Sequence, residues 1–258
     1  MDYEMASVPD HADTVAKRRD VLAALATPTS KPVLVDDLDT SRSTVDRAID
    51  ALMAHDFVAR QGSEYVATYA GRAAVDAYER LLERLDTLER VQPVLSALPA
   101  DIDIDPTILD GATVVESKPS APQAPVETNV AAVRDATSFR GTGPAVVPRY
   151  TDVVLSLLEN DATDVELVLT DAVVDALAET YPDGFANLSG ADGLALYVTD
   201  ETLPYAVWTA ETPDRTASGM VVYDDNGIVG VINNDTDAMN EWAAAQYEQA
   251  RRGARRLD

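Results

Sequence analysis

The chain has no cysteine, only three lysines and only two histidines among its 258 residues. The lack of cysteine excludes a disulfide framework and thiol chemistry. No apolar run approaches the ~18 residues that a membrane-spanning helix needs. The first ten residues, MDYEMASVPD, have neither the basic flank nor the apolar core of a secretion signal. We therefore expect a cytoplasmic protein with no membrane partner.

Acidic side chains dominate the composition, with 45 Asp and Glu residues and a formal net charge of −25. An acidic surface that is poor in lysine keeps a protein soluble in molar salt, so the composition indicates a halophilic, archaeal source. An ordinary acidic cytosolic protein is the alternative. Residues 1–99 hold 17 acids and 11 bases, whereas residues 100–258 hold 28 acids and 9 bases. This asymmetry suggests two parts with different roles.

The first part of the chain has the pattern of helices followed by a β-hairpin. Periodicity and end signals predict three helices, at residues 13–26, 32–38 and 41–55. The third helix places a set of apolar side chains on one face, namely Val45, Ala48, Ile49, Leu52 and Met53. The alternating stretches FVARQ and EYVAT then flank a turn at Gly62. This order predicts an α+β winged helix-turn-helix domain over residues 10–70.

The helix that starts near residue 41 is the candidate DNA reader. In a helix-turn-helix, the second helix of the motif enters the major groove with its N-terminal residues at the base edges. Short hydroxyls and long guanidinium groups suit phosphates and guanine bases, respectively. The DNA-binding side chains that we predict are Ser41, Arg42, Ser43, Thr44, Arg47 and, beside the hairpin tip, Arg60. A well-capped helix on a solvated surface is the alternative explanation of the same residues.

Asp46 and Asp50 lie on the same helix and mildly oppose contact with DNA, itself a polyanion. Asp46 could accept from a cytosine amino group, or it could pair with Arg42 or with the neighbours of Asp50 on the helix. Each phosphate contact makes log K fall with log salt, with a slope of about −0.9. In molar salt, a DNA-binding protein therefore needs a few close arginine contacts rather than long-range attraction.

Residues 69–91 are predicted to form a longer helix. Its seam repeats every three or four residues, at Ala74, Tyr78, Leu81, Leu85 and Leu88. The seam either packs against its own domain or pairs with a second subunit, so we assign residues 71–98 to a linking or dimerising segment. The stretch LPADIDIDP, residues 98–106, resembles a linker.

The second domain, residues 107–258, alternates strands with helices and is predicted to be α/β. Candidate strands are ATVVES, TSFRGTG, VELVLT, GLALYVT, YAVWTA, GMVVYD and GIVGVIN. Candidate helices cover residues 123–134, 149–159, 171–180 and 236–256. The last two strands meet at Asp225-Asn226-Gly227, which is a strong hairpin signal.

The second domain lacks the residues that enzymes use most. His11 and His55 both lie outside it, so it has no Ser–His or Cys–His pair. It has no phosphate-binding glycine loop. The pair Asp224-Asp225 could hold a metal in principle, but such pairs are expected on any surface this acidic. We predict that the protein is not an enzyme and carries no cofactor and no metal.

Two stretches of the second domain, residues 139–177 and 227–254, resemble a known family. Three features carry the resemblance. Pro148-Arg149-Tyr150 opens a helix, the strand VELVLT leads into another helix, and GVINND leads into a helix that contains tryptophan. The family comprises archaeal winged-helix transcriptional regulators named for a regulator of filament formation and methanogenesis. The resemblance implies a dimeric regulator of double-stranded DNA whose second domain senses a small-molecule effector or mediates assembly.

Three side chains are candidate effector ligands: Arg140, Arg149 and Tyr150. The arginines would suit an anion, and Tyr150 could line a pocket together with Tyr205 and Trp208. The alternative is that the arginines pair with nearby acids. The alternative hypothesis is that the second domain only joins subunits and senses no effector.

Overall fold

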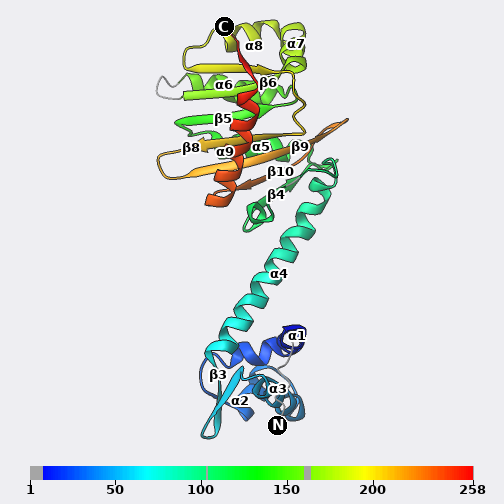
Figure 1. Cartoon of the computed structure of the whole chain (residues 1–258), viewed down its shortest axis with the longest axis vertical. Coiled ribbons are helices and arrows are strands. Elements are labelled where there is room, and N and C mark those ends of the chain that lie inside the picture. The colour runs from blue at the N-terminus through cyan, green and yellow to red at the C-terminus, as the bar shows by residue number, and fades with distance from the viewer. Residues whose placement is uncertain (1–7, 103, 160–163, 258) are drawn as a thin grey trace. The chain divides into compact units, whose positions relative to one another are not determined.

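The structure is a computed structural model that describes residues 8–102, 104–159 and 164–257 (Figure 1). It contains two compact units, Met1–Asp86 and Thr87–Asp258. The boundary lies within one helix, α4 (Tyr69–Leu95), so most of the predicted linking segment is helical and is shared by both units. Residue 103 of the predicted linker lies outside the described residues.

The N-terminal unit has helices and a small sheet in the predicted order. The helices before α4 are α1 (Val8–Ala24), α2 (Lys31–Asp37) and α3 (Arg42–Ala54). The strands are β1 (Thr29–Ser30), β2 (Val58–Gln61) and β3 (Glu64–Ala67), in the antiparallel order β1-β3-β2. The two-residue strand β1 was not predicted, because it is too short to show an alternating pattern.

Burial explains why α3 takes its place in this unit. Val45, Ile49 and Leu52 are fully buried in a core completed by α1 and α2. Met53 was predicted on the same face but is 38% exposed, since it lies at the edge of the apolar stripe. Gly62 adopts a φ of 63° in the hairpin, a conformation that glycine reaches without strain.

The second unit is built on one eight-stranded sheet of order β11-β7-β6-β5-β8-β9-β10-β4. The strands are β4 (Thr113–Glu116), β5 (Ser138–Gly143), β6 (Asp164–Thr170), β7 (Leu194–Thr199), β8 (Tyr205–Glu211), β9 (Thr216–Asp224), β10 (Gly227–Asn234) and β11 (Arg255–Arg256). The helices are η1 (Pro106–Leu109), α5 (Ala124–Val133), α6 (Pro148–Leu158), α7 (Asp171–Thr180), α8 (Pro182–Ser189) and α9 (Asp237–Arg252). Strand β11, helix α8 and the short helix η1 were not predicted.

The sheet is mixed, which corrects the α/β expectation for this domain. Among the described strands, only β5, β6 and β7 run parallel, and they are joined through helices. Strands β8, β9 and β10 follow one another through short turns, and strands joined by a tight turn must run antiparallel. The predicted turn at Gly227 is present, and that glycine has a φ of 124°.

Helices cover both faces of the sheet. Helices α5 to α8 pack on one face, and α9 lies across the other, the face turned to the viewer in Figure 1. The last turns of α4 join the α9 face through the buried side chains of Val91 and Val94. A Cβ atom on Gly230 would lie 2.5 Å from Val94 Cγ2, so glycine at this position of β10 allows the close approach of α4.

Candidate nucleic-acid interface

The start of α3 is ordered by hydroxyl groups. Ser41 is the N-cap residue, and its Oγ accepts a hydrogen bond from the Thr44 backbone N–H at 3.2 Å. The same oxygen lies 3.0 Å from Ser43 Oγ and 2.9 Å from Thr44 Oγ1. Three short hydroxyls therefore gather at the positive end of the helix dipole, where anions such as phosphate bind most readily.

Two arginines project from the exposed side of α3. Arg42 and Arg47 are both exposed, whereas Val45 is fully buried behind them. Arg47 Nε donates to the Ser43 carbonyl at 3.1 Å, which leaves its two terminal amino groups to bind elsewhere. Within the described part of the chain, the Arg42 guanidinium makes no hydrogen bond or ion pair. Both side chains can therefore reach an external partner without first breaking an ion pair.

One of the two acids in this helix, Asp46, is neutralised by a neighbouring helix. Asp46 Oδ1 lies 2.6 Å from Lys31 Nζ, at the start of α2. This hydrogen bond lowers the pKa of Asp46 and raises the pKa of Lys31. Of the alternatives open for Asp46, an ion pair with Arg42 is not formed, because Lys31 takes the carboxylate, although the charge of Arg42 also lowers the pKa of Asp46. Sequence spacing did not show this contact, although the scarcity of lysine could have drawn attention to Lys31.

The hairpin β2–β3 carries a third exposed arginine. Arg60 Nε donates to the Gly62 carbonyl at 2.8 Å. Its guanidinium carbon lies 6.0 Å from the centre of the Tyr65 ring, and Lys31 Nζ lies 5.2 Å from the same ring. Tyr65 is thus placed between two cations by the antiparallel register that pairs it with Arg60. Sequence reasoning did not single out Tyr65.

The three predicted effector ligands do not form one site. Arg140 Nε lies 3.4 Å from Glu166 Oε1, and Arg149 Nε lies 3.5 Å from Glu127 Oε1. Both arginines are therefore partnered by acids, as the alternative explanation had it. Arg140 lines a hollow together with Tyr247 of α9, so it lies on the opposite sheet face from α6. Tyr150 is the one candidate whose side chain turns inward.

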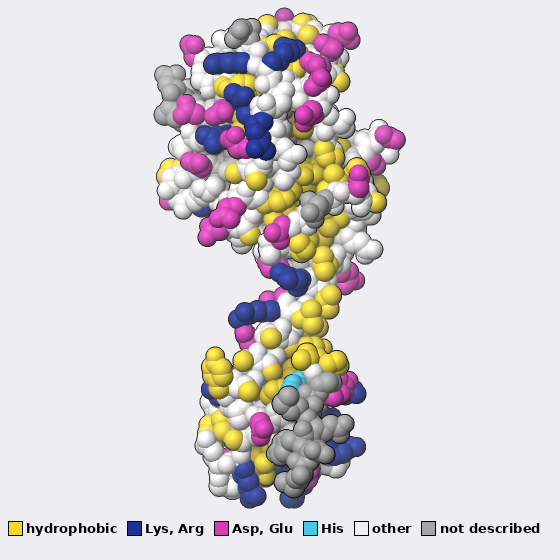
Figure 2. Space-filling model, viewed as in Figure 1, with side chains coloured by type: hydrophobic (Ala, Val, Ile, Leu, Met, Phe, Trp, Pro, Cys, Tyr) yellow, Lys and Arg dark blue, Asp and Glu magenta, His cyan; other side chains and the backbone are white. Residues whose placement is uncertain are grey.

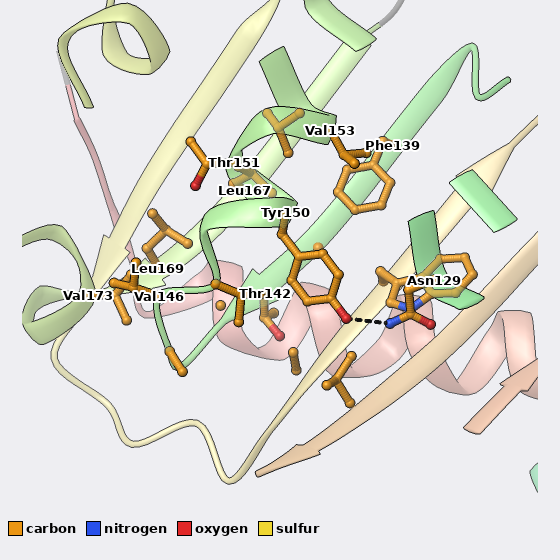
Figure 3. A pocket seen from close by; sticks show the side chains of 18 of the residues that line it. Asn129, Phe139, Thr142, Val146, Tyr150, Thr151, Val153, Leu167, Leu169 and Val173 are labelled. Carbon is orange, nitrogen blue, oxygen red and sulfur yellow. Dashed lines mark hydrogen bonds between the residues drawn. The ribbon is translucent and has the colours of Figure 1, made fainter. Parts of the chain in front are cut away.

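Tyr150 lines a cavity between the sheet and helices α5 to α8 (Figure 3). The cavity has a volume of about 120 Å³. The Tyr150 hydroxyl accepts a hydrogen bond from Asn129 Nδ2 at 3.1 Å. Burial raises the pKa of Tyr150 to about 12, although the bond from Asn129 acts in the opposite direction. Trp208, also named from the sequence, lines the same cavity, whereas Tyr205 stacks on Trp242 with a centroid separation of 5.8 Å.

Comparison with known protein families identifies the family of this chain. Residues 122–253, about half of the sequence, match the family described as methanogenesis regulatory protein FilR1, middle domain. The chain belongs to the FilR1 family. Residues 10–90 of this FilR1-family chain also match a family described as the HVO_A0261 N-terminal domain. The resemblance stated from the sequence is thereby confirmed.

Solved structures give weaker similarities. The archaeal chromatin protein TrmBL2, whose structure is described as showing a novel mode of DNA binding, has a TM-score of 0.44 and 10% identity over 97% of this chain and 100% of its own. NucT from Helicobacter pylori has a TM-score of 0.44 and 9% identity, over 57% and 98%. Polyphosphate kinase from Porphyromonas gingivalis has a TM-score of 0.37 and 9% identity, over 76% and 28%. Similarities at this level do not bear on function.

Curated protein sequences give no significant match to the chain. Among the described residues, no helix is both long and apolar enough to cross a membrane. In the same residues, no three His, Asp or Glu side chains are grouped so that they could hold a metal ion.

Proposed function

We propose that this FilR1-family chain is a sequence-specific DNA-binding transcriptional regulator, and that residues 10–70 form its winged helix-turn-helix. One observation carries the proposal. Arg42 and Arg47 project from a helix whose opposite face is anchored in the core, and the acid that lies between them, Asp46, is already neutralised by Lys31. Membership of a family of regulators favours regulation over catalysis.

Each side chain of this surface has a role in the proposal. The hydroxyls of Ser41, Ser43 and Thr44 bind a phosphate at the N-terminus of α3, which fixes the position of the helix on the duplex. Arg42 and Arg47 bind base edges in the major groove, where a guanidinium can donate two parallel hydrogen bonds to guanine. Arg60, on the hairpin, binds the flanking DNA backbone.

The contact between Lys31 and Asp46 yields a prediction about the recognition helix. Replacing Lys31 with methionine keeps most of the side-chain volume but leaves the Asp46 carboxylate unneutralised in a surface that faces a polyanion. We expect weaker DNA binding and a higher pKa for Asp46, the first measured by fluorescence anisotropy and the second by an NMR titration of the carboxyl group. Lys17→Met is the matched control, because Lys17 pairs at 2.8 Å with Asp13 on α1. Equal effects of the two variants would contradict the proposal.

The proposed role of Arg60 yields a prediction about salt. Arg60→Ala is expected to weaken binding to operator and non-operator DNA alike, because a phosphate contact carries no sequence information. The slope of log K against log salt should become less steep by about 0.9, the value for one phosphate contact. Anisotropy titrations over a series of potassium chloride concentrations measure both effects. A loss confined to the operator, with an unchanged slope, would show instead that Arg60 reads a base.

We also propose that the chain is a homodimer joined through α4. The two explanations of its leucine seam apply to different parts of it. Ala74 and Tyr78 pack on the core of the N-terminal unit. Leu81, Leu85 and Leu88 are instead 49%, 51% and 39% exposed, and hydrophobic side chains are visible on the surface of α4 in Figure 2.

The charges beside this seam suit a parallel pair. With Leu85 and Leu88 as core positions of a heptad, Arg84 and Glu89 take the two flanking positions. In a parallel coiled coil, these positions face each other across the interface with a spacing of five residues, so each Arg84 would face Glu89 of the other copy. Parallel helices also place two recognition helices at the same end, as a two-fold symmetric operator requires.

The dimer proposal predicts the effect of polar substitutions in the seam. Replacing Leu81 and Leu85 with serine should convert the dimer to a monomer and weaken operator binding, because half-site contacts then no longer act together. Sedimentation in concentrated potassium chloride measures the mass. Glu83→Gln, a change on the outer face of the same helix, should leave the dimer intact. A wild-type chain that sediments as a monomer at tens of micromolar would contradict the proposal.

For the second unit we propose effector sensing. The apolar cavity beside Tyr150 supports this role, since ligand sites are concave, mostly apolar and furnished with a few polar groups. The other candidate, a domain that only assembles subunits, is supported by the family resemblance alone. A thermal shift produced by a ligand separates the two, because binding at 100 times the dissociation constant stabilises a protein by about 2.7 kcal/mol.

A further inference from the structure

None of the described residues that line the cavity beside Tyr150 carries a charged side chain. One wall is the segment 145–154, which leads into α6 and carries Val146, Val153 and Val154; the other is the sheet, with Phe139 and Leu167 (Figure 3). Burying an unpaired charge in such surroundings is strongly unfavourable. The cavity therefore selects against the anionic effector that Arg140 and Arg149 suggested.

The volume of the cavity limits the size of what it can hold. An apolar cavity of about 150 Å³ stays dry and binds benzene. At about 120 Å³, the cavity here is slightly smaller. A compact ring or a short branched chain fits, whereas a sugar or a nucleotide requires α6 to move away from the sheet.

A chain of amide groups sets the hydrogen bonding at one end of the cavity. Asn233 Nδ2 donates to Asn129 Oδ1 at 2.8 Å, and Asn129 Nδ2 donates to the Tyr150 hydroxyl at 3.1 Å. The Tyr150 oxygen therefore acts as an acceptor in this chain, and its own hydrogen is left to be donated. Since burial keeps this hydroxyl protonated to about pH 12, it can donate throughout the physiological range.

A second donor lies at the other end of the same amide chain. Trp208 is 5% exposed and lines the cavity, and among the described residues neither its indole Nε1 nor Asn233 Oδ1 has a hydrogen-bond partner. Nε1 and Asn233 Oδ1 are close together, because a Cβ atom placed on Gly219 would lie within 2.5 Å of both. A buried donor without a partner is unfavourable, but an acceptor of the protein already lies beside Nε1, so the Tyr150 hydroxyl is the donor that this site leaves for a ligand.

We propose that this cavity binds a small uncharged molecule that is apolar except for one acceptor oxygen, such as a cyclic ketone of about seven non-hydrogen atoms. The ring packs against Phe139, Leu167 and Val154, and the oxygen accepts a hydrogen bond from the Tyr150 hydroxyl. The inference gives the chemical class of the effector, and so it rests on the sensing role proposed above for the second unit.

Fluorescence of Trp208 tests this assignment directly. In full-length Trp242→Phe protein, Trp208 is the only tryptophan, and cyclohexanone is the probe. We expect a saturable change in emission with a dissociation constant of about 1 mM, well short of the ceiling for a ligand of this size. Tyr150→Phe should weaken binding roughly tenfold through the lost hydrogen bond. Cyclohexanecarboxylate, which has a similar ring and a charge, should not bind.

Two variants that fill the cavity serve as controls. Ala206→Leu, on the sheet wall, and Val154→Phe, on α6, should each abolish the saturable change, and either one suffices if the other does not fold. A change that persists in a folded filled variant reports a solvent effect and overturns the inference, as would tighter binding of the carboxylate. DNA retention measured on the same samples separates the two proposals. Retention without cyclohexanone binding sinks only the inference, whereas absence of retention in the wild-type chain sinks the regulator proposal.

Discussion

Replacing both Arg42 and Arg47 with alanine is expected to abolish operator-specific binding. Each arginine that reads a base accounts for about 1–3 kcal/mol, and the two effects should add if the side chains read separate bases. The sum is comparable with the lower part of the ~4–10 kcal/mol that separates specific from non-specific binding. Fluorescence anisotropy in molar potassium chloride, on DNA selected from a random library by the wild-type chain, measures the loss.

The control for this pair of variants is Arg80→Ala. Arg80 lies on α4, pairs with Asp76 at 2.6 Å, and has no place in the proposed DNA surface. The Arg80→Ala substitution removes one positive charge, as Arg42→Ala or Arg47→Ala alone would, and it should leave operator affinity unchanged. Equal retention by the double variant and the wild-type chain would show that α3 is not the reading helix.

Gly71→Ala is expected to cause the largest loss of stability in the N-terminal unit. A Cβ atom at this position would lie 2.1 Å from the Phe57 carbonyl oxygen and 2.9 Å from its carbon, so the backbone must move. The same carbonyl oxygen accepts a hydrogen bond from the Thr68 N–H at 2.9 Å. This bond joins the end of β3 to Phe57, the residue just before β2. Overpacking of this kind costs up to about 3 kcal/mol. The melting temperature of the unit should then fall by roughly 10–20 °C.

Gly184→Ala is a closely matched control for this variant. Gly184 is the third residue of α8, as Gly71 is the third residue of α4. The nearest atom to its added Cβ is Tyr181 Cβ at 3.9 Å, an ordinary contact distance. Alanine should be neutral there, or stabilising by up to about 1 kcal/mol. Hydrogen exchange followed by mass spectrometry reports each unit separately, and unchanged protection of the N-terminal unit in Gly71→Ala would contradict the expectation.

Local patterns in the sequence predicted most of the elements. The apolar stripe of α3 follows from helical periodicity, because residues three and four apart share a face of a helix. The turns at Gly62 and Gly227 follow from the need for a positive φ, which few residues other than glycine satisfy. The outward direction of Arg42 and Arg47 was predictable for the same reason, since the burial of Val45 and Ile49 fixes the opposite face.

Contacts between residues far apart in the sequence could not be predicted. The hydrogen bond between Asn233 and Asn129 joins residues 104 positions apart. Neither asparagine stands out in its local sequence, so no local pattern predicts the bond. The pairing of Lys31 with Asp46 depends on how α2 packs against α3. The antiparallel pair of β9 and β10 was predicted from its turn, but the antiparallel direction of β8 was not, because strand direction depends on the lengths of connections and no turn signal was recognised between β8 and β9.

Genome-wide mapping of bound sites tests the central claim most directly. Tagged full-length chain is immunoprecipitated with its DNA from the native host, in parallel with the Arg42→Ala and Arg47→Ala double variant at equal abundance. The account predicts discrete sites that share one sequence motif and vanish in the variant. Identical sites for both proteins, or no discrete sites for the wild-type chain, would contradict it.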